Sequence, residues 1–433
     1  MGLRGRSTWC EVACSRRNSA IPSDQRLLFG GDRVGSIILA IDAQHEFAAE
    51  VPLNPTPIAL PVSIVFVALL ILALSIRRIR SVGRLPHRKW RRVTEWLVLS
   101  LVTLVCAAAT LTTTYNMIAQ RYYQSIYKAP GKLYEVGGYR MHLYCTGEGS
   151  PTLVLEAGWT VPALGWGTVQ PELSKTTKVC SYDRAGYGWS EPQPGPRDAD
   201  QIATQLHALL QQAGVTGPII LMGHSMGGLY IRDYASHYPE NLVGLIFVDA
   251  ITPVQPGQLS PELRADLYEI PTYEYYIFSM TYGLGIPRVM GECSKVYAGF
   301  EEHTERMLAE SVCNSLLGEI WKEYKGWWQS FDETIHTGPY GNLPILIFSR
   351  DPQKHSGAGA PSRLELEESV VWNQMQEDLK KFSTRNRRII FRGSGHEIPL
   401  ERADLLNKEV LVFVRQIRNE APQPTDYGST KTE

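Results

Sequence analysis

A serine stands between two glycines at residues 223–227, in the order Gly223-His224-Ser225-Met226-Gly227. The aliphatic run 218–222 precedes it, and a stretch with helical spacing follows at once. Such a strand–turn–helix setting exposes the serine hydroxyl at a helix N-terminus, where the helix dipole favours developing negative charge. Only small residues fit at Gly223 and Gly227 in so tight a turn. The pattern therefore predicts that Ser225 is a nucleophile.

A serine hydroxyl needs a base to remove its proton and an acid to orient that base. We expect the base late in the chain, and His396 stands in the sequence GSGHEIP after the apolar run 387–392. We expect the acid after the preceding apolar run, 344–349, where Asp351 is the preferred candidate. Its rival is Asp249, at the end of the run 242–248. The turn before Asp351 is one or two residues shorter than expected, so both carboxylates stay open.

Acyl transfer also needs hydrogen-bond donors for a developing oxyanion. One predicted donor is the backbone N–H of Met226, directly after the nucleophile. The second should come from the loop after the first parallel strand, which contains Gly158 and Trp159. The N–H of Trp159 is the candidate.

The elements that must position these residues follow from the hydrophobic pattern. Short runs rich in β-branched residues read as buried strands of a mostly parallel sheet, at 152–156, 177–182, 218–222, 242–248, 344–349 and 387–392. Helical stretches alternate with them, at 198–214, 363–382 and 401–419. Residues around Gly137-Gly138 predict a leading antiparallel hairpin. This alternation predicts an α/β fold over residues 130–420, with an aromatic-rich helical lid at about 251–342.

Two long uncharged runs precede this domain. They predict transmembrane helices at 56–76 and 95–119, because roughly 20 apolar residues span a bilayer as a helix. The loop 77–94 between them is rich in arginine, so the positive-inside rule places it in the cytoplasm and the α/β domain outside. We expect the helices to act as a tether. Residues 1–55 are expected to be mostly disordered, and residues 421–433 form a tail after the α/β domain.

The seven cysteines show no zinc-ligand spacing, which predicts no metal site. Outside the cytoplasm the last four could form two disulfides, for which we prefer Cys145–Cys180 and Cys293–Cys313. Free buried thiols are the alternative. The net charge of −1 gives no electrostatic case for nucleic acid as a partner.

Residues 130–420 resemble the α/β-hydrolase superfamily, in its lid-bearing serine-hydrolase branch. GHSMGG matches the nucleophile elbow of that superfamily, SYDRAGYGWS (181–190) resembles its D-R-x-G-x-G-x-S loop, and GSGHEI resembles its histidine loop. The order Ser…Asp…His also agrees. One departure is that the usual His-Gly of the oxyanion loop is Ala157-Gly158 here, which puts the loop geometry in doubt.

The residues and the resemblance together predict a membrane-anchored serine hydrolase that needs no cofactor and cleaves a carboxylic ester with an apolar or lipid-like acyl group. One alternative is a serine aminopeptidase, in which acidic lid residues such as Glu301, Glu302 and Glu305 would hold a free amino terminus. Another is a receptor or adhesion module that keeps the fold without turnover.

Overall fold

The computed structural model describes residues 59–82, 89–294, 300–314, 317–355 and 360–418. The predicted terminal segments 1–55 and 421–433, together with Cys10 and Cys14, lie outside these residues.

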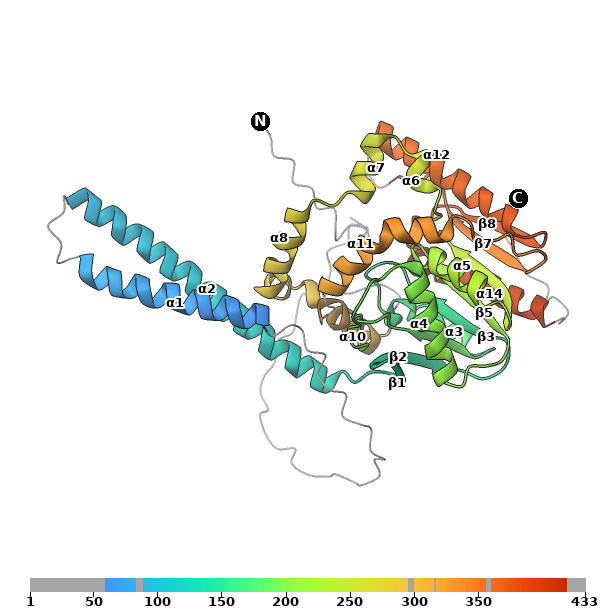
Figure 1. The fold of residues 1–433 in the computed structure, drawn as a ribbon, viewed down its shortest axis with the longest axis horizontal. Helices are drawn as coiled ribbons and strands as arrows, with labels where there is room; N and C mark the ends of the chain where they lie inside the picture. The colour runs from blue at the N-terminus through green and yellow to red at the C-terminus, as the bar shows by residue number, and fades with distance from the viewer. Residues whose placement is uncertain (1–58, 83–88, 295–299, 315–316, 356–359, 419–433) are drawn as a thin grey trace, which may run out of the picture. The chain divides into compact units, whose positions relative to one another are not determined.

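The centre of the molecule is an eight-stranded sheet with the order β1-β2-β4-β3-β5-β6-β7-β8 (Figure 1). Its strands are β1 (Lys132–Val136), β2 (Tyr139–Thr146), β3 (Thr152–Glu156), β4 (Val179–Tyr182), β5 (Ile219–His224), β6 (Leu242–Val248), β7 (Ile345–Arg350) and β8 (Asn386–Phe391). β1 and β2 form the antiparallel hairpin, β2 pairs antiparallel with β4, and the other neighbours are parallel. The predicted strands are therefore confirmed, to within two residues at each end.

Alternate residues of the central strands enter two separate cores. Leu221 and Phe247 face the core that also contains side chains of α4 (Ala199–Gln212) and α5 (Gly227–His237). Ile220 and Ile246 face the opposite core, with α3 (Gln170–Leu173) and α14 (Ala403–Ile417). Because side chains alternate across a strand, a strand covered on both faces is apolar throughout, as these sequences are.

Local capping explains where the flanking helices begin. The Asp198 side chain accepts a hydrogen bond from the Gln201 N–H at the start of α4. Ser362 and Glu365 form a reciprocal capping box at the start of α12 (Arg363–Asp378). Such caps satisfy N–H groups that the first helical turn leaves unpaired. The remaining short elements of this domain are η1 (Ala163–Trp166), η3 (Leu379–Phe382) and α13 (Ile398–Glu401).

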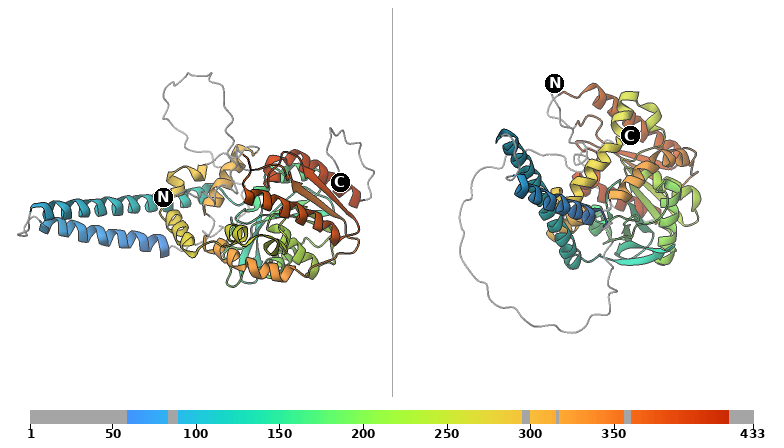
Figure 2. Two further views of the ribbon diagram at one scale, coloured as in Figure 1. Left: turned by 90° about the horizontal axis from the view of Figure 1, so that it is seen from above. Right: turned by 60° about the vertical axis from the view of Figure 1, so that its left-hand side comes forward.

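A helical insertion lies between β6 and β7, in the segment for which the sequence predicts a lid, and we refer to it as the lid. Its elements are α6 (Gln255–Gln258), α7 (Pro261–Tyr268), α8 (Thr272–Gly283), α9 (Ile286–Val289), η2 (Glu292–Ser294), α10 (Glu302–Asn314) and α11 (Leu317–Thr334). Of these, α9 and α10 contact α2, whereas α6 and α7 lie next to α12 (Figure 1, Figure 2).

Two long helices precede the sheet, α1 (Ala59–Val82) and α2 (Lys89–Ile126), and they pack side by side. Both extend into the predicted loop 77–94, so less of that segment is loop than we expected. Among the described residues, one helix, α2, is long and apolar enough to cross a membrane. The prediction of two spans is therefore supported for one helix by length and composition.

The predicted pairing of the last four cysteines is confirmed. Cys145 and Cys180 join β2 to β4, and Cys293 and Cys313 join η2 to α10 within the lid. Cys106, on α2, is buried and forms no disulfide bond.

Candidate functional site

Ser225 lies in the turn between β5 and α5, with a positive φ of 55°. This left-handed conformation is uncommon for a residue with a side chain and is typical of the strained turn that exposes a nucleophile. A Cβ on Gly223 would stand 2.5 Å from the Gly227 carbonyl oxygen, and one on Gly227 would stand 2.6 Å from the Glu156 carbonyl oxygen. The two glycines thus permit a turn in which no side chain would fit.

His396 follows β8 and joins two groups that are far apart in the sequence. Its Nε2 lies 2.9 Å from Ser225 Oγ, and its Nδ1 lies 2.7 Å from Asp249 Oδ2. The Asp249 side chain is fully buried, whereas that of His396 keeps 20% of its surface exposed. The three side chains form one unbroken chain of hydrogen bonds. In the tautomer that fits it, Nδ1 carries the proton and Nε2 accepts from the serine.

The preferred acid, Asp351, is not the carboxylate that the structure brings to His396. Asp351 accepts backbone hydrogen bonds from Gln353 N and Gly393 N and pairs with Arg392. Because β7 runs to Arg350, Asp351 comes directly after the strand, and its carboxylate turns toward the loop after β8. The rival candidate, Asp249, follows the neighbouring strand β6 and reaches His396 Nδ1.

The Asp249 carboxylate accepts further hydrogen bonds besides the one from His396. Its Oδ1 accepts hydrogen bonds from Arg350 N and from Trp372 Nε1, each at 2.9 Å. Burial opposes its ionisation, but the hydrogen bond from His396 and the charge of Arg350 outweigh burial and lower the pKa of the Asp249 carboxyl. Burial likewise opposes the charging of His396, yet its hydrogen bond to Asp249 and that carboxylate's charge raise the pKa of the imidazole. Asp249 therefore favours an imidazolium on His396.

The predicted oxyanion loop lies against Ser225. A Cβ on Gly158 would stand 3.3 Å from Ser225 Cβ and 3.3 Å from His224 Nδ1, so the loop backbone approaches the serine closely. Met226 directly precedes α5, at its N-cap position. The Trp159 ring packs edge-on against Trp327 of the lid helix α11. The structure thus brings four of the predicted residues, Gly158, Trp159, Ser225 and Met226, to one end of the sheet.

A buried arginine that our sequence analysis did not single out supports this loop. Arg184 Nη1 donates to the Ala157 carbonyl and Nη2 to the Gly158 carbonyl, both at 2.7 Å. The same guanidinium pairs with Glu156 at 2.7 Å and with Glu323 of α11 at 3.1 Å. Burial raises the pKa of Glu156 to about 7 against the opposing charge of Arg184. The signal was present in the sequence, since Arg184 belongs to the quoted motif SYDRAGYGWS.

Two sets of side chains in the described part of the chain bring three possible metal ligands close together. One is His224, His396 and Glu397, but both ring nitrogens of His396 already contact Asp249 and Ser225. The other is Asp200, Asp233 and His237, of which Asp233 is buried and the other two are exposed. A proton transfer between Ser225 and His396 would use neither set as a metal site. The lid carboxylate Glu302, considered above for amine binding, forms a surface ion pair with Arg306 one helical turn away.

Comparisons with known proteins show the family and the fold of this chain. A family model described as "Alpha/beta hydrolase family" matches residues 153–409. The uncharacterized protein YbdG of Bacillus subtilis is 25% identical over 337 residues, which are 75% of this chain and 99% of YbdG. A bifunctional esterase/perhydrolase of Acinetobacter calcoaceticus is 21% identical over 285 residues, 61% of this chain and 92% of the relative. The solved structure of DBJA is 16% identical, with a TM-score of 0.50 over 67% of this chain and all of DBJA, and shows a similar fold.

Proposed function

Because the chain belongs to the alpha/beta hydrolase family, we propose that it is a membrane-anchored serine hydrolase that cleaves carboxylic esters with an apolar or lipid-like acyl group. One observation carries the proposal: the hydrogen-bonded chain from Ser225 Oγ through His396 to Asp249. Each member has the chemistry that acyl transfer requires, namely a nucleophile, a base and an acid that orients the base. The esterase/perhydrolase relative supports the choice of an ester.

The proposed reaction has two steps. Ser225 Oγ attacks the carbonyl carbon while its proton passes to His396 Nε2, and the negative charge that develops on the carbonyl oxygen is stabilised by backbone N–H groups. We assign these donors to Met226 and Trp159. His396 then gives the proton to the leaving alcohol, and an acyl-enzyme remains. In the second step His396 takes a proton from water, the hydroxide attacks the ester of Ser225, and the acid and the serine hydroxyl are regenerated.

The acid in this proposal is Asp249, which replaces Asp351. Its carboxylate accepts the proton of His396 Nδ1, fixes the ring, and stabilises the imidazolium that forms when Ser225 is deprotonated. The lowered pKa of Asp249 keeps it ionised at neutral pH, as this role requires. Gly158, Gly223 and Gly227 contribute by permitting close backbone approach. The reaction as written needs no metal or organic cofactor.

The membrane anchor is proposed to consist of both α1 and α2, with the basic segment between them in the cytoplasm and the hydrolase domain outside. The apolar composition of α2 supports the anchor. The two disulfides support an extracytoplasmic domain, because disulfides persist in oxidising compartments. A reporter fused after Glu433 tests the orientation: a cytoplasmic reporter would overturn it.

The activity is tested with the full chain purified in detergent. A fluorophosphonate probe should label the wild type, and the label should disappear in Ser225→Ala and weaken strongly in His396→Ala. A series of p-nitrophenyl esters should then show activity that rises as the acyl chain lengthens beyond butyrate. Absent labelling would favour a receptor or adhesion module, and preference for an aminoacyl amide would favour an aminopeptidase.

A further inference from the structure

Helices α8 and α9 of the lid expose a set of large apolar side chains. Four of them, spaced by three and four residues, lie on one face of α8, and two follow at the end of α9. This apolar lid face consists of Tyr273, Tyr276, Ile277, Met280, Val289 and Met290, which are 55–73% exposed. Large apolar side chains that gather on an exposed helix face are typical of a surface that contacts protein or membrane.

The segment is also poor in charge. Residues 271–291 contain two charged residues, Glu274 and Arg288. Arg288 is buried, and its guanidinium forms a bidentate pair with Glu310 of α10, at 2.7 and 2.8 Å. An ordinary solvated helix carries charged side chains on its exposed face. Here the one cation of the segment is turned inward.

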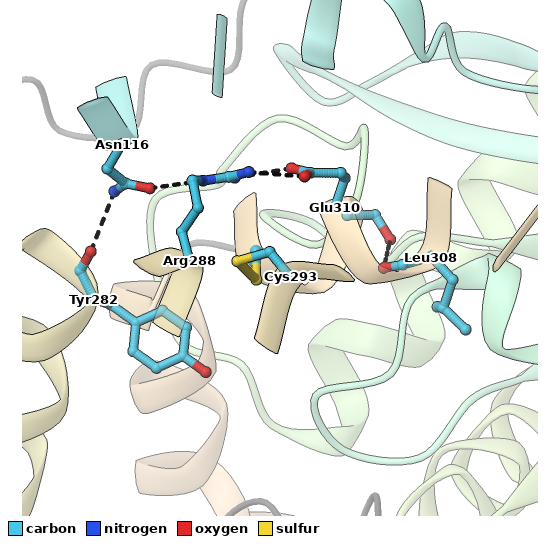
Figure 3. The surroundings of a disulfide bond; sticks show 8 residues. Asn116, Tyr282, Arg288, Cys293, Leu308 and Glu310 are labelled. Carbon is cyan, nitrogen blue, oxygen red and sulfur yellow. Dashed lines mark hydrogen bonds and ion pairs between the residues drawn. A yellow bond between two sulfur atoms is a disulfide. The ribbon is translucent and has the colours of Figure 1, made fainter. Parts of the chain in front are cut away.

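The same arginine joins the lid to helix α2. Arg288 Nε donates to Asn116 Oδ1 at 3.0 Å, and Asn116 Nδ2 donates to the Tyr282 carbonyl at 3.3 Å (Figure 3). Gly285, between α8 and α9, lies so close to α2 that an added Cβ would stand 2.6 Å from Asn116 Cβ. The α8–α9 connection is therefore packed on α2 at the level of Asn116, beside the Cys293–Cys313 disulfide.

The position of Asn116 along α2 sets the height of the lid relative to a bilayer. Trp96 and Tyr115 are both exposed and lie 19 residues apart on α2, which is about 29 Å along a helix. That length matches a hydrocarbon core of about 30 Å, and aromatic residues favour its two boundaries. Asn116 follows Tyr115, so the contact with the lid falls at the boundary next to the hydrolase domain.

We propose that the apolar lid face docks on the lipid bilayer that α2 crosses, in the leaflet next to the hydrolase domain, and that an ester substrate reaches Ser225 from this leaflet. The proposal rests on the membrane anchor and the ester hydrolysis proposed above. In this proposal α2 does more than tether the domain, the role expected from the sequence, because its contact with the lid fixes the position of the lid relative to the bilayer. The bilayer is the favoured occupant because the connection between α8 and α9, the two helices that carry this face, contacts α2 at its bilayer boundary.

The first test measures contact with lipid and does not depend on activity. A fluorophore is attached to Met290→Cys in full-length protein in phosphatidylcholine nanodiscs, in a background with Cys10, Cys14 and Cys106 replaced by alanine. Val370→Cys on α12 is the matched control, because Val370 is an apolar residue with 70% exposure on another helix. Lipids carrying a quencher near the headgroup should quench the label at 290 and leave that at 370 unchanged. Equal, weak quenching at both sites would overturn the proposal, as would protection of residue 290 by a second copy of the chain.

The second test separates delivery of substrate from chemistry. The double variant Ile277→Glu/Met290→Glu should cleave a long-chain ester in vesicles about tenfold more slowly, because apolar contact with the interface is lost. Its rate on soluble p-nitrophenyl acetate should stay within twofold of the wild type, and Val370→Glu should change neither rate. Unchanged vesicle turnover, or an equal loss on both substrates, would overturn the docking. If the wild type cleaved neither ester while the label at 290 were still quenched, the proposed hydrolysis would fail and the docking would stand.

Discussion

Replacing Asp249 by asparagine should inactivate the enzyme through the tautomer of His396. Asp249 Oδ1 accepts from two N–H donors, Arg350 N and Trp372 Nε1, so the amide oxygen of an asparagine must occupy that place. The amide NH₂ then faces His396 Nδ1, which must lose its proton in order to accept a hydrogen bond. The proton moves to Nε2, and Nε2 can no longer take the proton of Ser225.

The size of this effect follows from comparable chemistry. Inverting the tautomer in a Ser-His-Asp triad lowers kcat by about 10⁴-fold, which corresponds to about 5 kcal/mol of transition-state stabilisation. The backbone should not move, because Asp249 has a φ of 44° and asparagine tolerates this left-handed conformation. The assay is kcat/KM for p-nitrophenyl butyrate, with thermal unfolding as the control for folding.

Asp351→Asn is the matched control. Asp351 accepts Gly393 N with one oxygen and Gln353 N with the other, so the amide loses one of these bonds. We expect a stability loss of about 1 kcal/mol and kcat/KM within about threefold of the wild type. If Asp351→Asn abolished activity while Asp249→Asn stayed within tenfold of the wild type, the role assigned to the Asp249–His396 contact would be refuted.

Two further predictions follow from the same contacts. Asp249 raises the pKa of His396 above its usual 6.5, and His396 must be neutral to act as a base. The kcat/KM of the wild type should therefore fall as the pH drops through a value above 6.5. A pH profile in which kcat/KM falls only below pH 6.5 would contradict this. Arg184→Gln leaves Glu156 and Glu323 buried without their shared cation, so it should lower the unfolding free energy by about 3–5 kcal/mol. It should also lower kcat more than it raises KM, because the loop carbonyls of Ala157 and Gly158 lose their donor. Denaturant unfolding measures the loss of stability, and steady-state kinetics measure kcat and KM. An unchanged kcat would show that Arg184 does not position the predicted oxyanion loop.

The elements of the sheet could be predicted because each buried strand has a continuous apolar sequence. β3 was predicted as 152–156 and is Thr152–Glu156, and its flanking breaks are marked by proline and glycine. Ser225 and His396, which the structure brings within hydrogen-bond distance, could also be singled out, because each stands next to glycines in a short loop after a strand. These features are local, so the sequence carries them directly.

The acid could not be chosen from local pattern alone. Asp249 and Asp351 both follow buried strands, and β6 and β7 are neighbours in the sheet. The choice depends on which turn directs its carboxylate toward the loop after β8, and this is set by tertiary contacts such as the Trp372 indole and the Arg350 backbone. The contact of α2 with the lid was missed for the same reason, since Asn116 and Arg288 are 172 residues apart.

The buried charges also decide which part of the lid can move. Glu323 of α11 pairs with Arg184 and Arg197, and Arg184 in turn holds the loop beside Ser225. Breaking one partner of a buried pair costs about 3–5 kcal/mol, so lifting α11 away from the sheet would be unfavourable and would disturb the oxyanion loop at the same time. No side chain of helix α8, by contrast, is fully buried. In the proposed hydrolase a substrate therefore reaches Ser225 at lower free energy past α8 than beneath α11, and α8 carries most of the apolar face that we propose to dock on the bilayer.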